Sequence, residues 1–167
     1  MKKGTGLLDP QKPLNFANLQ ESCPLFQRAR RQEYRVQSPK SIAYNCIAFA
    51  AGRTDRRWWP PGGAEPGEDF WPAGVPAEET LDAFAAAFGT VGYAPCAGPE
   101  LELAFEKIAV YALASGAPTH AARQLPSGAW LSKLGDLQDI EHQTLEALEG
   151  GDYGKAVRFL RRPRQVG

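Results

Sequence analysis

Residues 41–52, SIAYNCIAFAAG, place a cysteine where a polar run becomes an unbroken run of small apolar residues. Residues 47–51 are apolar on every side, which is typical of a short helix that is buried all round. Gly52 can adopt the positive φ at which many helices end. The segment therefore predicts a buried helix with the Cys46 thiol in its first turn.

Two interpretations of Cys46 follow from that position. A helix N-terminus carries unpaired N–H groups and a partial positive charge, which favour a lowered thiol pKa and a reactive thiolate. The alternative is a small core residue, because free cysteine is among the most buried residue types.

Length and charge limit the other classes of function. A chain of 167 residues can bury its own core as one domain. Its 19 basic and 19 acidic side chains cancel, so nothing indicates a nucleic-acid partner or a membrane surface. Three scattered cysteines without a C-x-x-C pair suit a reducing compartment. We expect a cytoplasmic protein of bacterial type, since neither a signal peptide nor a membrane span is visible. Secretion by a signal-independent route and the oligomeric state stay open. We expect no cofactor.

The pattern along the chain predicts an α+β fold in three parts. Residues 1–33 form an N-terminal arm with a short helix, 34–162 a single domain, and 163–167 a frayed tail. A helix is expected at 76–88, beginning at Pro76 and closed by Gly89. A short helix around Leu145 is expected among the turns of 135–149. Strands of a small antiparallel sheet are expected at 34–36, 107–113, 119–125, 130–134 and 156–160, with a tight hairpin at 126–128.

Residues 53–76 differ from the rest of the chain, because they contain three of the four tryptophans, Trp58, Trp59 and Trp71. Their proline and glycine content predicts a long ordered loop that the aromatic rings hold onto the body. The loop is either the aromatic wall of a substrate groove or a satellite cluster that covers the core.

The first histidine gives the cysteine a possible partner. A cysteine nucleophile needs a base, and the base needs a third group that orients its ring. His120 lies at the start of the strand expected at 119–125, and across the hairpin either Ser132 or Lys133 is within its reach. The alternative for His120 is a strand-end histidine that is hydrogen-bonded to the backbone.

The order of these parts resembles the papain-like cysteine peptidase superfamily, in particular its NlpC-type and CHAP-type branches. Those families carry a cysteine at a helix N-terminus, a histidine on a following strand and a polar orienting residue on the next. The NlpC-type pattern places the third residue twelve positions after the histidine. The resemblance implies a papain-like fold with Cys46 as nucleophile, His120 as base and Ser132 as orienting residue. The chain also resembles a family of short uncharacterised bacterial proteins that share YNCIAFAAG, PTHAARQLP-G-W-SKLG and DIEH.

The favoured function is therefore a cysteine-dependent hydrolase or acyl transferase that acts on an amide bond of a peptide or protein. Asp139 is a second candidate for the orienting group, because a carboxylate stabilises an imidazolium better than a hydroxyl does. Tyr44 and Asn45 are the side chains nearest to a possible oxyanion hole. The remaining substrate-contacting candidates are Trp58, Trp59, Trp71 and Lys133.

Two alternatives stay open. A non-catalytic module on the same fold would bind a peptide through the tryptophan-rich loop, and a serine in the third position favours it. A zinc site is the other alternative, since the residue types suit zinc although no close-spaced ligand pair exists. Its ligands would be Cys46, His120, Asp139 and His142.

Overall fold

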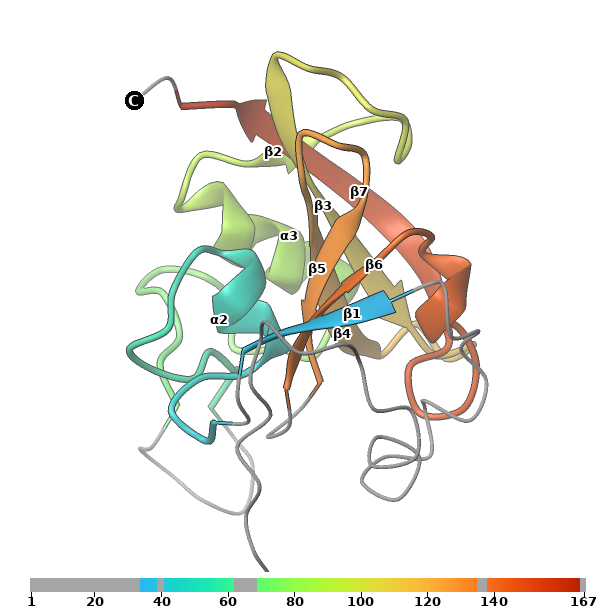
Figure 1. Ribbon diagram of the computed structural model, residues 1–167. Helices are drawn as coiled ribbons and strands as arrows, with labels where there is room; N and C mark the ends of the chain where they lie inside the picture. Colours follow the sequence, from blue (N-terminus) through green and yellow to red (C-terminus); the bar gives the residue numbers. More distant parts are fainter. Residues whose placement is uncertain (1–33, 39–40, 62–68, 135–137, 166–167) are drawn as a thin grey trace, which may run out of the picture.

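The computed structural model describes residues 34–38, 41–61, 69–134 and 138–165. Within them the chain forms one seven-stranded sheet, two α-helices and one 3-10 helix (Figure 1). In chain order the elements are β1 Tyr34–Ser38, α2 Cys46–Ala50, α3 Leu81–Gly89, β2 Ala94–Pro95, β3 Phe105–Ala112, β4 Pro118–Gln124, β5 Trp130–Lys133, β6 Asp139–His142, η3 Glu146–Leu148 and β7 Lys155–Pro163. The predicted α+β class is confirmed, whereas the predicted arm at 1–33 lies outside the described residues.

The sheet has the strand order β1-β6-β5-β4-β3-β7-β2, and all neighbouring strands are antiparallel. The predicted hairpin between β4 and β5 is confirmed. Its ends are joined by a hydrogen bond of 2.7 Å from Leu125 N–H to Ala129 O, and Gly128 adopts a φ of 92°. Side chains alternate between the two faces of each strand, so the sheet separates two cores.

Both α-helices of the described residues lie on one face of the sheet. Figure 1 shows α2 and α3 together on one side and the turn that bears η3 on the other. The helix-covered core contains Ile108, Val110 and Ala121 from the sheet, together with Cys46 and the apolar residues of α2. The opposite core contains the alternate residues of the same strands, Ala109, Tyr111 and Ala122, with Trp130, Leu148 and Tyr153.

Helix α2 begins at Cys46 because Asn45 caps it. The Asn45 Oδ1 atom accepts hydrogen bonds from Ala48 N–H at 3.1 Å and from Trp58 N–H at 2.9 Å. Its Nδ2 atom donates to Trp58 O at 2.7 Å. One side chain thus satisfies an orphan donor of the helix and fixes the backbone of the tryptophan-rich segment. Gly52, at a φ of 82°, follows the helix as predicted.

Helix α3 begins five residues later than predicted. Thr80, not Pro76, ends the loop, because its Oγ1 atom accepts the Ala83 N–H at 3.1 Å and caps the first turn. Gly89 is the last residue of the helix instead of the residue after it. No helix in the described ranges is long and apolar enough to cross a membrane.

The C-terminal part of the sheet corrects three expectations. Strand β6 occupies residues that were expected to be turns. It lies between β1 and β5 and pairs with both. The two-residue strand β2 was not predicted, and it pairs with β7. Strand β7 runs to Pro163, and Arg164 N–H then donates to Ala104 O at 2.8 Å. The first residues of the predicted tail are therefore held next to the start of β3. The short helix that was expected near Leu145 is present as η3.

Candidate functional site

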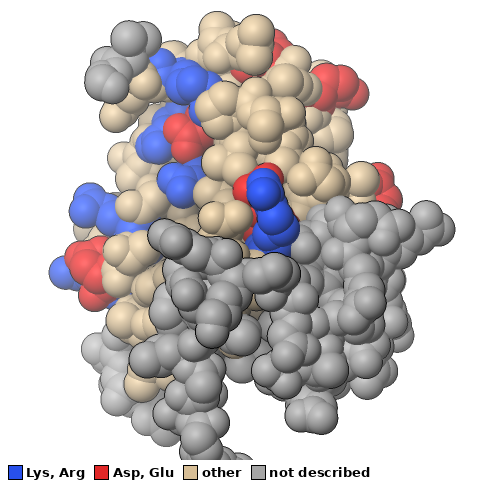
Figure 2. Space-filling view, in the orientation of Figure 1, with Lys and Arg blue, Asp and Glu red and all other residues tan. Residues whose placement is uncertain are grey.

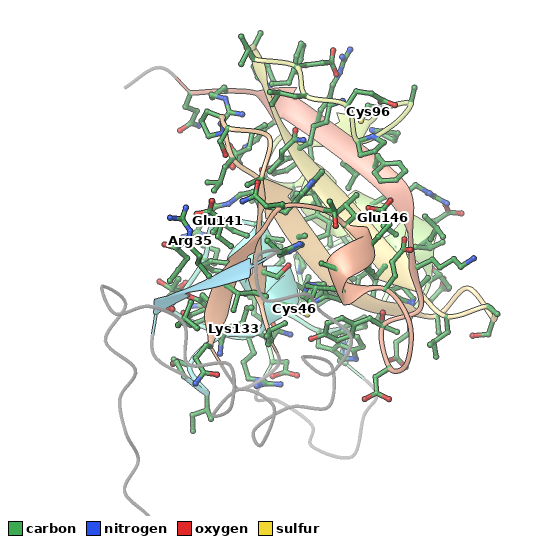
Figure 3. All side chains as sticks on the ribbon, turned by 45° about the vertical axis from the view of Figure 1, so that its right-hand side comes forward. Arg35, Cys46, Cys96, Lys133, Glu141 and Glu146 are labelled. Atoms are coloured by element: carbon green, nitrogen blue, oxygen red, sulfur yellow. The ribbon has the colours of Figure 1, made fainter. Side chains whose placement is uncertain are left out.

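Cys46 is the first residue of α2, as predicted, but its thiol is enclosed. The residue is 7% exposed, and its Sγ atom lies 3.9 Å from the carbonyl oxygen of Thr119 on β4. Figure 3 shows Cys46 in the middle of the molecule and Cys96 near one end. The thiol therefore packs between the helix and the sheet.

Burial reverses the expected shift of the thiol pKa. Desolvation raises the pKa of Cys46 to about 11, and the backbone N–H of Ala121 and those of the first turn offset this only in part. A thiol with this pKa is protonated at neutral pH, so the predicted low pKa is corrected. A five-residue helix with a buried first turn stabilises a thiolate less than loss of water destabilises it.

His120 belongs to a fully buried polar network on the other side of the sheet. Its Nε2 atom lies 2.9 Å from Ser132 Oγ, which lies 2.7 Å from His142 Nε2. His142 Nδ1 lies 2.8 Å from Thr144 O. All three network side chains are 0% exposed. The network ties β4, β5 and β6 together, and it contains the predicted contact between His120 and Ser132.

The carbonyl at the end fixes the direction of every hydrogen bond in this network. Thr144 O can only accept, so His142 carries its proton on Nδ1 and offers Nε2 as an acceptor. Ser132 therefore donates its hydroxyl proton to His142 and accepts from His120 Nε2–H. His120 is left with an unprotonated Nδ1 that has no partner among the described residues. The ring stacks on Tyr153, with centroids 4.3 Å apart.

The predicted nucleophile and base lie on opposite faces of the sheet. His120 pairs with Tyr111 on the face that η3 covers, and its ring packs against Tyr111 and Tyr153. Cys46 packs against the neighbouring Ala121, whose side chain points the other way. The structure brings Cys46 close to the backbone of β4 but directs the His120 ring away from it.

Asp139 is likewise separated from His120. Its Oδ2 atom accepts hydrogen bonds of 2.5 Å from both Tyr44 Oη and Ser38 Oγ, on the helix-covered face. Burial, with the bond to Asp139, raises the pKa of Tyr44 to about 12. Lys133 is 0% exposed, and its Nζ lies 5.1 Å from the centre of the Tyr44 ring. Tyr44, Lys133 and Asp139 thus form buried polar contacts of the core.

The residues of the zinc alternative are divided between the same two faces. His120 and His142 share the Ser132 hydroxyl, whereas Cys46 and Asp139 lie across the sheet. Within the described ranges, no group of three or more His, Cys, Asp or Glu side chains is arranged to hold a metal ion.

The three tryptophans of the long loop have different roles. Trp59 and Trp71 hold the loop on the body: their indole N–H groups donate to Glu79 Oε1 at 3.0 Å and to Pro76 O at 3.1 Å. Both rings also pack on Phe84 of α3. Trp58 is 3% exposed, and its indole N–H has no acceptor among the described residues.

A pocket of about 460 Å³ lies where this loop meets the end of α3. Its lining residues are Arg53, Asp55, Arg56, Trp58, Phe70, Pro72, Ala73, Thr90 and Val91. The walls are fixed by backbone hydrogen bonds on both sides of Phe70, from its own N–H to Arg57 O and from Trp59 N–H to its carbonyl. The guanidinium of Arg56 lies 4.9 Å from the centre of the Phe70 ring. The pocket is therefore an ordered feature built from the tryptophan-rich segment.

Fold and pocket together define a mixed α+β protein with a seven-stranded antiparallel sheet and a loop-built pocket. The chain belongs to the family described as Domain of unknown function (DUF7689), which it matches over residues 35–161. No curated protein and no solved structure matches the chain.

Sequence reasoning missed His142 as a partner of Ser132 and missed the arginines of the pocket. The signal for His142 was the alternation of residues 139–142, DIEH, in which an isoleucine and a histidine share one face of a strand. Arg53 and Arg56 lie in a segment without periodicity, so no pattern in the sequence indicates which of its side chains face a common pocket.

Proposed function

We propose that this chain is a non-catalytic binding module that holds a peptide segment of a partner protein in the pocket beside Trp58. Trp, Phe and Arg are the residue types enriched at the centre of protein interfaces. The hydrogen bonds of Trp59, Trp71 and Asn45 order the described parts of the loop in advance, and residues 62–68 of the predicted loop lie outside the described residues. A preformed wall reduces the entropy that is lost when a ligand binds.

The observation that carries this proposal is the state of Trp58. Its ring lines the pocket, yet its buried indole N–H makes no hydrogen bond within the described residues. Buried indole N–H groups usually find an acceptor, and leaving one unpaired costs about 1–3 kcal/mol. A carbonyl or carboxylate oxygen of a ligand would supply the missing acceptor after a small adjustment of the wall.

Selection from a random peptide display library tests the proposal. We expect enriched peptides to lose binding to Ala73→Phe, which adds a ring to an exposed position of the pocket without a change of charge. The matched control is Ala114→Phe, at an exposed position after β3 that does not line this pocket. Equal binding to both variants, or no enrichment on the wild-type protein, would contradict the proposed function.

The papain-like hydrolase stays a prediction, and the first-turn position of Cys46 is the observation that favours it. To act together, the Cys46 thiol and the His120 ring would have to reach the same face of the sheet, and the thiol would have to lose its proton despite a raised pKa. The geometry therefore supports binding better than catalysis.

Alkylation of the native protein separates these two functions. We expect iodoacetamide at pH 7 to modify the half-buried Cys96 faster than Cys46, because the Cys46 thiol is both enclosed and protonated. The measurement is the modified fraction of each cysteine by peptide mass spectrometry over time. If Cys46 reacts faster than Cys96, and if His120→Ala slows that reaction in protein that is still folded, the hydrolase is the better account.

A further inference from the structure

The pocket beside Trp58 presents hydrogen-bond donors without matching acceptors. The Arg53 side chain is exposed and forms no ion pair with the described residues. Arg56 lies over Phe70, which holds its guanidinium at the rim. The lining therefore offers hydrogen-bond donors from Arg53, Arg56 and the indole N–H of Trp58.

One carboxylate of the lining opposes these charges in part. Asp55 Oδ2 lies 3.7 Å from Arg56 Nε, and both side chains are more than half exposed, at 58% and 55%. An exposed pair at this distance contributes little and leaves the remaining N–H groups of Arg56 available. The lining therefore keeps a net positive charge from two arginines and one aspartate.

This charge is local. Figure 2 shows both acidic and basic side chains on the described part of the face in view, and the whole chain has a formal net charge of zero. A general attraction for polyanions is thus not expected, and the selectivity for a negative group would come from the pocket itself. Arginine forks suit the planar, two-oxygen geometry of a carboxylate.

We infer that the ligand of this pocket is an acidic peptide segment, in which a carboxylate binds Arg53 and Arg56 and an adjacent apolar or aromatic group packs on Phe70 and Trp58. This inference rests on the proposed function and adds the chemical class of the ligand. The carboxylate would also bring an oxygen acceptor into a pocket lined by Trp58, whose buried indole N–H lacks one among the described residues.

Small probes test the charge requirement without knowledge of the full ligand. Phenylacetate has the ring and the carboxylate, phenylacetamide replaces the charge with a neutral amide, and phenyl phosphate replaces it with another anion. Each is titrated into ¹⁵N-labelled protein, and the indole N–H signal of Trp58 is followed. We expect saturable movement with phenylacetate, affinity at least about tenfold weaker with phenylacetamide, and no preference for phenyl phosphate.

Arginine variants locate the charge. Arg53→Gln is expected to weaken phenylacetate binding about fivefold or more, because a charge-assisted hydrogen bond is lost. Arg35→Gln is the matched control, since Arg35 lies on β1 paired with Glu141 and does not line the pocket (Figure 3). Equal loss in both variants would assign the effect to general charge and overturn the inference.

The outcomes separate the ligand class from the proposed function. Equal binding of phenylacetamide and phenylacetate keeps the pocket as a binding site and overturns the acidic ligand. Tighter binding of phenyl phosphate overturns the carboxylate in favour of a phosphate group. If no probe moves the Trp58 signal, the acidic ligand fails, while the peptide selection with Ala73→Phe still decides the proposed function independently.

Discussion

Lowering the pH from 7 to 5 is expected to reduce the free energy of unfolding by about 3–4 kcal/mol, an unusually steep loss for mildly acidic conditions. The cause is the buried network of two neutral imidazoles joined by Ser132. Burial lowers the pKa of His142 to about 4, and burial together with the neighbouring His142 lowers the pKa of His120 well below its ordinary value of 6.5.

The sign follows from proton binding in the two states. Below pH 6.5 the unfolded chain protonates both histidines, whereas in the folded chain His142 stays neutral until the pH approaches 4 and the pKa of His120 lies well below 6.5. The unfolded state thus binds more protons, so stability is fully present above pH 6.5 and falls as the pH decreases through this window. Each histidine contributes up to about 1.4 kcal/mol per pH unit there.

Urea unfolding at half-unit steps from pH 7.5 to 5 measures this loss. Ordinary carboxylates titrate near pH 4, so they contribute little across the steps chosen. Long-range ¹⁵N spectra of the two imidazoles provide the control, with the folded protein expected to show neutral His142 protonated on Nδ1 and neutral His120 protonated on Nε2 at pH 6. A flat stability profile, or charged imidazoles in the folded protein at that pH, would contradict the described network.

The second large effect is expected at the start of β7. Gly154→Ala should destabilise the protein by at least about 3 kcal/mol, because the new Cβ would meet a backbone atom that cannot move aside alone. That Cβ would lie 2.1 Å from Ala112 O, and Gly154 also has a φ of 72°. The carbonyl belongs to the last residue of β3, so relief requires a shift of one strand against the other.

Gly116→Ala is the matched control for this substitution. Gly116 also has a positive φ, of 89°, but a Cβ there would meet nothing within 4 Å. It should therefore cost only the backbone strain, about 1–2 kcal/mol. Thermal and urea unfolding of both variants give the comparison. Similar losses in the two would show that the close approach of Gly154 to β3 is absent.

Much of the sheet can be predicted from the sequence, because its strands carry local signals. Residues 107–113, 119–125 and 130–134 contain apolar or alternating runs separated by Gly, Pro and Ser, and the structure places strands there within two residues at each end. Strand β6 was missed because it is short and Ile140 is its single apolar residue. Its place next to β1 depends on a pairing between residues 101 or more positions apart, which no local pattern reports.

The candidate site illustrates the same limit. The order of Cys46, His120 and Ser132 along the chain is compatible with a catalytic arrangement, and the contact of His120 with Ser132 is present. What the order cannot fix is the face of β4 on which the histidine lies. A shift of one residue in register moves every side chain to the other face. With Tyr111 opposite His120, the ring joins the core away from α2.

The pocket was anticipated only as a region. Tryptophan and proline content predicted an ordered loop at residues 53–76. Which of its tryptophans attach the loop to the body and which lines the pocket depends on tertiary contacts. Trp59 and Trp71 are held by Glu79 and Pro76, and Trp58 lines the pocket. Asn45 connects this wall to the first turn of α2, so Cys46 and Trp58 belong to the same core cluster.

The most direct test of the central claim is a map of where a selected peptide binds. A peptide enriched by display is titrated into ¹⁵N-labelled protein, and the backbone and indole signals are followed. The account predicts saturable shifts centred on the Trp58 indole and on the amides of Arg53, Arg56 and Thr90, around the pocket. Shifts centred on Cys46 and His120, with the Trp58 indole unmoved, would contradict it.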